Sequence, residues 1–247
     1  MTNNLQRLVI EPTQQRDREI FLTTSQQHYL GRVLRLKEGD RFIAMDGKGQ
    51  WLLACLDATL TQARVIEVVA VETELPVAVT LVVALPKGNG FDQVVTQATE
   101  LGVSCFVPVI SDRTLLKPSP RKLERWQRLA QEAAEQSERQ VVPTILEPVD
   151  FRHYLVGLNA TNTENIQQYI CVARNQAAMH LQTALNATRS PSIALAIGPE
   201  GGWTAEEVEM AIAAGFQSVS LGQRILRAVT APIVALSLAA AVIEGYS

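Results

Sequence analysis

The stretch SIALAIGPEGGWTAEEVEMAIAAGF, residues Ser192–Phe216, decides the fold class. Its first six residues, Ser192 to Ile197, predict a buried strand, and three glycines follow within the next five residues. Thr204 and Glu207 then have the spacing of a capping box, which predicts the start of a helix. A glycine-rich connection between a strand and a helix fits a ligand loop, where the backbone approaches a small molecule, and equally fits a tight turn.

A second stretch further along the chain repeats this arrangement. The apolar run Ser218 to Leu221 leads into the sequence GQRILR, and an apolar helix follows Thr230. Pro232 suits the first turn of that helix. Two glycine-bearing loops at strand ends can form a crevice for a small molecule, and Arg224 and Arg227 would place positive charge beside it. The alternative for both arginines is ordinary solvated surface charge.

The rest of the chain divides into two patterns. Before residue 72, short apolar runs alternate with turns such as Asp46–Gly49, which predicts a small β domain over residues 1–72. The polar, proline-ended stretch 72–76 marks the boundary. From residue 77 to 247, buried strands alternate with helical periodicities, which predicts an α/β domain with a largely parallel sheet. The predicted strands of that domain are Val79–Leu85, Cys105–Ile110, Tyr169–Ala173, Ser192–Ile197 and Ser218–Leu221.

The net charge excludes a nucleic-acid-binding protein that is basic over its whole surface, but local basic patches could still bind a polyanion. The 247 residues carry a formal net charge of -3. Between residues 113 and 128, however, six basic residues and one acid, Glu124, give 6 − 1 = +5. The basic residues are Arg113, Lys117, Arg121, Lys122, Arg125 and Arg128. A second cluster in the β domain comprises Arg32, Arg35 and Lys37. An exposed helix face is the alternative, but two clusters in two domains favour a polyanion such as RNA.

Several other classes of protein are disfavoured. Three unpaired, widely spaced cysteines fit a reducing cytosol, and the polar first residues do not resemble an export signal. The longest charge-free stretch, residues 228–243, has 16 residues, short of the ~20 needed for a membrane span. The three histidines lie far apart, so we expect no metal site. Gln93 stands where a dinucleotide fingerprint needs its third glycine, which argues against a nucleotide-dependent oxidoreductase.

Four ordered motifs, together with features of the first domain such as Val33-Leu34-Arg35, resemble the ribosomal RNA small subunit methyltransferase E family, a SPOUT-class family. The motifs are QATELG at 97–102, EAAEQS at 132–137, IGPEGG at 197–202 and LGQRILR at 221–227. The resemblance spans nearly the whole chain. It implies an N-terminal PUA-like β-barrel that binds RNA, followed by a SPOUT α/β domain with a C-terminal trefoil knot at about residues 192–247.

The resemblance also implies a function. The expected reaction is methyl transfer from S-adenosylmethionine to N3 of one uridine in 16S, small-subunit ribosomal RNA, by a cytoplasmic homodimer acting on free RNA or on an assembled subunit. The implied cofactor-binding residues are Val172, Ile197, Gly198, Glu200, Gly201, Gly202, Leu221, Gly222, Ile225, Leu226 and Thr230. The candidate RNA-binding residues come from the two basic clusters and are Arg32, Arg35, Lys37, Arg113, Arg121, Lys122, Arg125 and Arg128.

The chain departs from the family pattern where catalysis is concerned. Val229 replaces a carboxylate of the family's Arg-Thr-Glu-Thr-Ala, so this position cannot supply the general base. Glu138 and Thr96 also differ from the usual residues. Arg227 is the expected catalytic residue, because a cation can stabilise the anion that forms on uridine. The missing carboxylate keeps a second hypothesis open, a catalytically silent ribosomal RNA-binding or assembly protein that retains the cofactor pocket.

Overall fold

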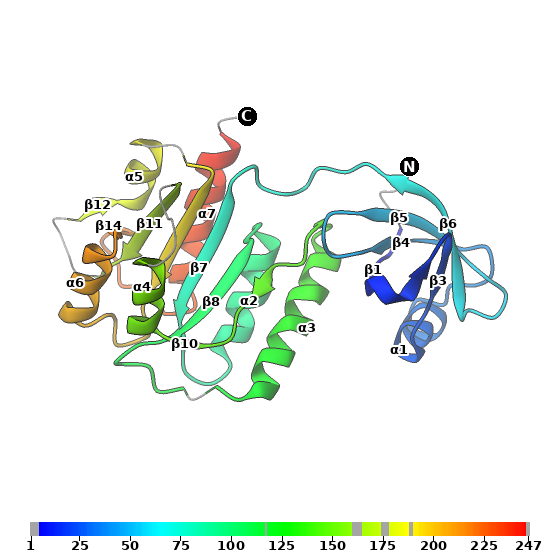
Figure 1. Ribbon diagram of the computed structural model, residues 1–247, viewed down its shortest axis with the longest axis horizontal. Helices are drawn as coiled ribbons and strands as arrows, with labels where there is room; N and C mark the ends of the chain where they lie inside the picture. Colours follow the sequence, from blue (N-terminus) through cyan, green and yellow to red (C-terminus); the bar gives the residue numbers. More distant parts are fainter. Residues whose placement is uncertain (1–4, 117, 160–164, 174–177, 188–189, 246–247) are drawn as a thin grey trace. The chain divides into compact units, whose positions relative to one another are not determined.

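The computed structural model describes residues 5–116, 118–159, 165–173, 178–187 and 190–245 (Figure 1). Lys117 of the basic run lies outside this set. The chain forms two compact units. The first unit comprises Met1–Glu74 and Ala134–Val142, and the second comprises Leu75–Ala133 and Pro143–Ser247.

The first unit is built on a curled six-stranded sheet in the order β1-β4-β5-β6-β3-β2. β1 pairs with β4 in parallel, and the remaining neighbours are antiparallel. The strands are β1 (Arg7–Val9), β2 (Gln15–Arg16), β3 (Glu19–Phe21), β4 (Arg41–Met45), β5 (Trp51–Leu56) and β6 (Gln62–Val69). Three helical turns accompany them, η1 (Pro12–Gln14), α1 (Thr24–His28) and η2 (Tyr29–Val33).

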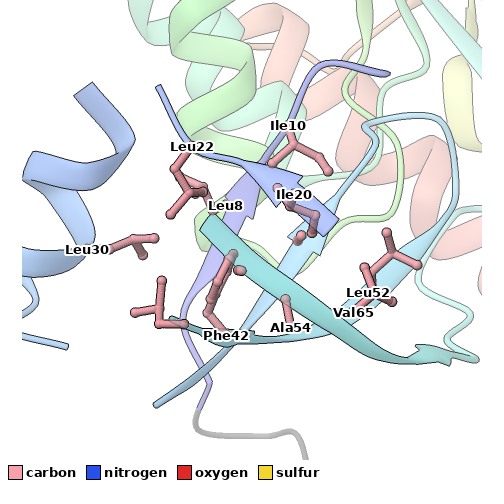
Figure 2. Packing of buried hydrophobic residues seen from close by; sticks show 12 residues of the cluster. Leu8, Ile10, Ile20, Leu22, Leu30, Phe42, Leu52, Ala54 and Val65 are labelled. Carbon is pink, nitrogen blue, oxygen red and sulfur yellow. The ribbon is translucent and has the colours of Figure 1, made fainter. Parts of the chain in front are cut away.

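The core on one face of this sheet is aliphatic and surrounds the ring of Phe42. Figure 2 shows Phe42, Ile20 and Leu30 turned toward one another from β4, β3 and η2, and all three are fully buried. The expected hairpin at residues 46–49 is confirmed, because it joins β4 to β5 with Gly47 at φ +67 and Gly49 at φ +120. Glycine is needed there because other residues rarely adopt a positive φ.

The chain returns to the first unit at residues 134–142. Glu135 Oε1 accepts a hydrogen bond from the Val9 main-chain N–H at 2.7 Å, and Arg139 pairs with Glu74 through a guanidinium that is 3% exposed. Glu138 has φ +61 at a helix C-terminus, where Arg139 N–H donates to Ala134 O. The predicted bounds, 1–72 and 77–247, do not include this return. Besides these side chains, a main-chain hydrogen bond from Val142 N–H to Gly47 O at 2.9 Å holds the returning segment.

The second unit alternates strands and helices. Its strands are β7 (Ala78–Ala84), β8 (Cys105–Ile110), β9 (Thr144–Ile145), β10 (Val149–Asp150), β11 (Ile166–Cys171), β12 (Met179–His180), β13 (Ser192–Ile197) and β14 (Gln217–Ser220). Its helices are α2 (Gly90–Glu100), α3 (Pro120–Gln136), whose last turn belongs to the first unit, α4 (Phe151–Asn159), α5 (Leu181–Ala187), α6 (Ala205–Ala213) and α7 (Ala231–Glu244).

In the described part of the second unit, the eight strands form one parallel sheet, as the sequence predicts. Their order is β10-β8-β7-β13-β11-β14-β12, with β9 beside β8. Every pairing is parallel. The central strands are buried on both faces, since Val82 and Val83 point to opposite sides of the sheet and both are fully buried. The fold is therefore a curled, mostly antiparallel β unit and an α/β unit with a parallel sheet, and the knot stays a prediction.

Helices cover both faces of this sheet. Phe151 and Leu155 of α4 and Ala211 of α6 pack on the face that carries Val82 and Val107. On the other face α7 contacts β7, β13 and α2 (Figure 1). Of the helices in the described part of the chain, none has both the length and the apolar run needed to cross a bilayer.

The Arg139 ion pair generates a stability prediction. Replacing Arg139 with Met would leave Glu74 without its cation, and breaking one side of a buried pair costs about 3 to 5 kcal/mol. We expect Arg139→Met to destabilise the first unit by ~3 kcal/mol. Hydrogen exchange of the β4 and β5 amides measures the free energy of opening of this unit alone.

Arg64→Met is the matched control, because Arg64 is exposed on β6 and its loss removes the same charge. Surface substitutions of this kind change stability by about 0.5 kcal/mol or less. Equal effects of the two variants would show that the Arg139 pair does not hold the returning segment.

Candidate functional site

A pocket lies at the carboxyl ends of three neighbouring strands, β13, β11 and β14. Parallel pairing places these ends at one edge of the sheet, so the loops that follow them meet there. They enclose a cavity of about 300 Å³, at the lower end of the size range of small-molecule sites. The lining comes from residues 171–173, 197–205, 221–222 and 224–226, joined by Arg113, Val208, Ala228 and Ala231.

The pocket brings together nearly all the residues that the sequence proposes for cofactor binding. Those that line it are Val172, Ile197, Gly198, Glu200, Gly201, Gly202, Leu221, Gly222, Ile225 and Leu226. Thr230 lies outside the lining, at the residue before α7, where its main-chain N–H donates to Arg227 O at 2.9 Å. The expectation that the two glycine-bearing loops lie together is confirmed.

Glycine is required at two positions of these loops. At Gly198 a Cβ atom would lie 3.2 Å from the Trp203 main-chain nitrogen and 3.3 Å from its ring. Gly222 has φ +109, a conformation that residues with a side chain rarely adopt. Gly198 therefore leaves room for Trp203, and Gly222 allows a backbone turn that a residue with a side chain would strain.

The wall beneath the first loop is aromatic. Trp203 lines the pocket, is 9% exposed and stacks on Phe151 of α4, with ring centroids 4.3 Å apart and an interplanar angle of 23°. Sequence reasoning missed Trp203, although it follows the glycines directly. Thr204 begins α6 as predicted, with Glu207 completing the capping box.

The loop after β8 braces the glycine loop from outside. Arg113 Nη1 donates to Gly201 O at 2.7 Å and to Trp203 O at 3.4 Å. The Asp112 main-chain N–H donates to Glu207 Oε1 at 2.9 Å. Sequence reasoning grouped Arg113 with the RNA-binding residues because of its neighbours in the chain.

An ion-pair network fixes the start of α6 from a third element. Arg152 of α4 donates to Glu206 Oε1 at 2.6 Å and to Asp112 Oδ2 at 3.0 Å. The hydrogen bond from Arg152 lowers the pKa of Glu206, and both carboxylates raise the pKa of Arg152. Glu206 therefore stabilises the folded state above its ordinary pKa, and this contribution is lost as the pH falls through the lowered value.

The charged residues of the pocket are few. Glu200 is the acidic residue of the described lining, and its Oε1 accepts a hydrogen bond from the Lys87 main-chain N–H at 2.9 Å. Arg224 lines the pocket and is exposed. Arg227, expected to be catalytic, is exposed and lies outside the lining. Val229 packs toward α2, since a Cβ on Gly90 would lie 2.8 Å from its side chain.

Some basic residues of α3 form hydrogen bonds or ion pairs with neighbouring residues, and others are exposed to solvent. Lys122 Nζ donates to Gly88 O at 3.0 Å, and Arg125 pairs with Asp92 at 2.7 Å. Arg128 lies 3.7 Å from Glu132 across an exposed i,i+4 pair, and Arg121 is exposed. In the first unit, the second cluster is exposed on η2 and the turn after it, at Arg32, Arg35 and Lys37.

Comparison with protein families agrees with this architecture. A model of RNA methyltransferase domains matches residues 73–240, and a model of the PUA domain of RNA methyltransferases matches residues 22–66. The fold and the site thus define an RNA methyltransferase with an N-terminal PUA domain.

Individual relatives narrow the family further. Ribosomal RNA small subunit methyltransferase E of Synechocystis sp. is 48% identical over 240 residues, which cover 96% of this chain and 78% of the relative. The enzyme of the same name from Neisseria gonorrhoeae, solved bound to S-adenosyl methionine, superposes with a TM-score of 0.83 at 31% identity, covering 95% of this chain and 96% of that one. A methyltransferase from Legionella pneumophila, solved with the cofactor SAM, gives 0.84 at 27% identity over 96% and 98% of the two chains. The chain belongs to the ribosomal RNA small subunit methyltransferase E family.

Cys171, at the end of β11, provides a test of how closed the pocket floor is. Burial raises the pKa of its thiol to about 12. Because the thiolate is the reactive form, a thiol with a raised pKa reacts slowly at pH 8. We expect iodoacetamide to leave Cys171 unmodified in the native protein at pH 8 and to alkylate it in urea, as measured by peptide mass spectrometry. Cys55, whose side chain is partly exposed, serves as the internal comparison. Rapid alkylation of native Cys171 would contradict the burial described above.

Proposed function

We propose that this chain transfers a methyl group from S-adenosylmethionine to N3 of a uridine in small-subunit ribosomal RNA. The observation that carries the proposal is the pocket built from the two glycine-bearing loops, in a chain of this family. The related enzyme from Neisseria gonorrhoeae was solved with S-adenosyl methionine, which supports the same cofactor here.

The residues of the pocket fit this cofactor. The absence of a Cβ at Gly198 leaves room for Trp203, which lines the pocket, and at Gly222 no Cβ stands between the main chain and an adenine or a ribose. Leu221, Ile225 and Leu226 supply apolar surface for the ring. When bound, the sulfonium supplies an activated methyl group, and the protein contributes alignment and electrostatics.

The target nitrogen imposes a second requirement. Uridine N3 is a weak acid, so its proton must be removed, or the anion stabilised as it forms, before the nitrogen can accept a methyl group. Glu200 is the carboxylate that the described pocket offers for the proton. Arg113 and Arg224 are the cations of the described lining, and Arg227 lies outside it, directly after Leu226 in the chain. We assign the stabilising role to Arg227.

The proposal includes a homodimer in the cytoplasm, where ribosomal RNA is available as free RNA or in the small subunit. Helix α7 supports the dimer, because its sequence APIVALSLAAAVIE is apolar on all sides, whereas a helix at the surface of a monomer carries a polar face. Ile233, Val234 and Leu238 stay half-buried in the single chain. A second copy of the chain packed against α7 would remove these three apolar side chains from solvent.

Mass-spectrometric mapping of methylated uridines tests the function. We expect ribosomal RNA from a strain lacking this protein to have lost one N3-methyluridine, and the intact gene to restore it. An unchanged methylation pattern, together with retained RNA binding by the purified protein, would favour the alternative of a catalytically silent RNA-binding protein, which the missing carboxylate at Val229 suggests.

The basic residues of α3 generate a prediction about RNA. Each phosphate contact contributes about -0.7 to -0.9 to the slope of log affinity against log salt concentration. If Arg121, Lys122 and Arg125 contact phosphates, replacing all three with Ala should flatten the slope by about 2 to 3. Filter binding of small-subunit ribosomal RNA over a salt series measures it.

A triple replacement of Arg16, Arg18 and Arg64 is the control, because these exposed residues of the first unit carry the same total charge. We expect it to leave the slope unchanged. An equal change in both triple variants would mean that net charge, and not this patch, governs binding.

Arg227 generates a prediction about catalysis. If it stabilises charge on the uracil in the transition state, Arg227→Ala should slow single-turnover methyl transfer by on the order of a hundredfold while cofactor affinity stays nearly intact. Arg224→Ala, tested beside it, shows whether the arginine that lines the pocket carries this role instead.

The competing explanation is that Arg227 pairs with Glu200 or Glu135 of a second copy. It predicts a weaker dimer and a loss of cofactor binding and methyl transfer together. Sedimentation of the same variant separates the two explanations, and near-normal transfer by an intact dimer would exclude a catalytic role for Arg227.

A further inference from the structure

Arg113 lines the pocket, although in the sequence it is the first of the basic residues that precede and form α3. Its Nη1 atom lies 2.7 Å from Gly201 O and 3.4 Å from Trp203 O. Its aliphatic stem fills the space beside Gly201, since a Cβ at that glycine would lie 3.1 Å from Arg113 Cδ and 3.3 Å from Arg113 Cβ. The guanidinium and the stem therefore both contact the glycine loop.

These contacts supply a brace from another element. Inside the loop, the Gly202 main-chain N–H donates to Pro199 O at 2.8 Å, which closes the turn locally. Arg113 adds charge-assisted hydrogen bonds to the carbonyls on either side of Gly202, and such bonds are stronger than those between neutral groups. A flexible, glycine-rich stretch is thus tied to the end of β8 at two points.

The backbone that carries Arg113 is itself fixed. The main-chain N–H of Asp112 donates to Glu207 Oε1 at 2.9 Å, and Arg152 donates to Asp112 Oδ2 at 3.0 Å. The Ser111 N–H donates to Thr114 Oγ1 at 3.0 Å on the other side. Arg113 therefore extends from a rigid support, as a positioning side chain requires.

We propose that Arg113 is a positioning residue of the cofactor pocket, which holds the Gly201 and Trp203 carbonyls in the arrangement that binds S-adenosylmethionine, and that it does not serve as an RNA phosphate contact. The inference rests on the proposed function of the pocket. It separates Arg113 from the α3 basic residues Arg121, Lys122, Arg125 and Arg128, which stay assigned to RNA.

The test compares Arg113→Met, which keeps a long stem but removes the donors, with Arg113→Lys, which keeps one cationic donor. Arg18→Met is the control, since Arg18 is an exposed arginine of the first unit that likewise donates to a main-chain carbonyl, Ile66 O, at 3.1 Å. Calorimetry with S-adenosylmethionine and S-adenosylhomocysteine measures cofactor affinity. RNA binding over a salt series measures phosphate contact.

We expect Arg113→Met to weaken the binding of S-adenosylmethionine and of S-adenosylhomocysteine by tenfold or more. Arg113→Lys should lose an intermediate part of this affinity, and Arg18→Met should lose none. In steady-state assays the KM for the cofactor should rise while kcat at saturation is largely kept, because uniform binding is lost. The RNA salt slope should stay unchanged. Unchanged cofactor affinity with a flattened slope would overturn the proposal and make Arg113 a phosphate contact.

Hydrogen exchange in the free protein separates this inference from the function itself. The amides of residues 200–204 should exchange at least tenfold faster in Arg113→Met than in the wild type, and at the wild-type rate in Arg18→Met. If the wild type bound neither S-adenosylmethionine nor S-adenosylhomocysteine, the proposed function would fail, and the exchange result would still decide whether Arg113 holds the loop.

If Arg113→Met does not fold, Gly201→Ala takes its place, because the added Cβ displaces the Arg113 stem. Wild-type exchange in that variant would also overturn the proposal.

Discussion

The parallel pairing of β11 with both β13 and β14 is the constraint on which the site depends. Ile170 lies opposite Ala196 on one side and Ser218 on the other, so the three strands end at the same edge of the sheet. Loops that are 24 residues apart in the chain at Gly198 and Gly222 consequently face a common cavity. A shift of register in either pairing would separate the loops, and the pocket would no longer form.

Glycine gives these loops access to a ligand but little rigidity, so the rigidity comes from elsewhere. Trp203 is stacked on Phe151 beneath the first loop, and Thr204 with Glu207 fixes the start of α6. Arg113 reaches the same loop from β8. Packing, capping and charge-assisted hydrogen bonds from three different elements thus compensate for the conformational freedom that glycine introduces.

Local sequence patterns predicted the parts of the fold that local physics decides. The long apolar strands, the glycine loops and the capping box at Thr204 all follow from neighbouring residues. The two-residue strands β9, β10 and β12 were beyond such reasoning, because hydrogen bonds to strands distant in the chain and not propensity create them. The return of residues 134–142 to the first unit, and the contact of Arg113 with Gly201, depend on partners 65 and 88 residues away.

The central claim is that the two glycine-bearing loops form the cofactor site, and a crystal structure of this protein grown with S-adenosylmethionine tests it most directly. We expect density for the adenosine between residues 198–202 and 221–226, with main-chain groups of both loops in hydrogen-bond contact with it. Density for the cofactor at another place on the chain, or an empty pocket at saturating cofactor concentration, would show that these loops are not the cofactor site.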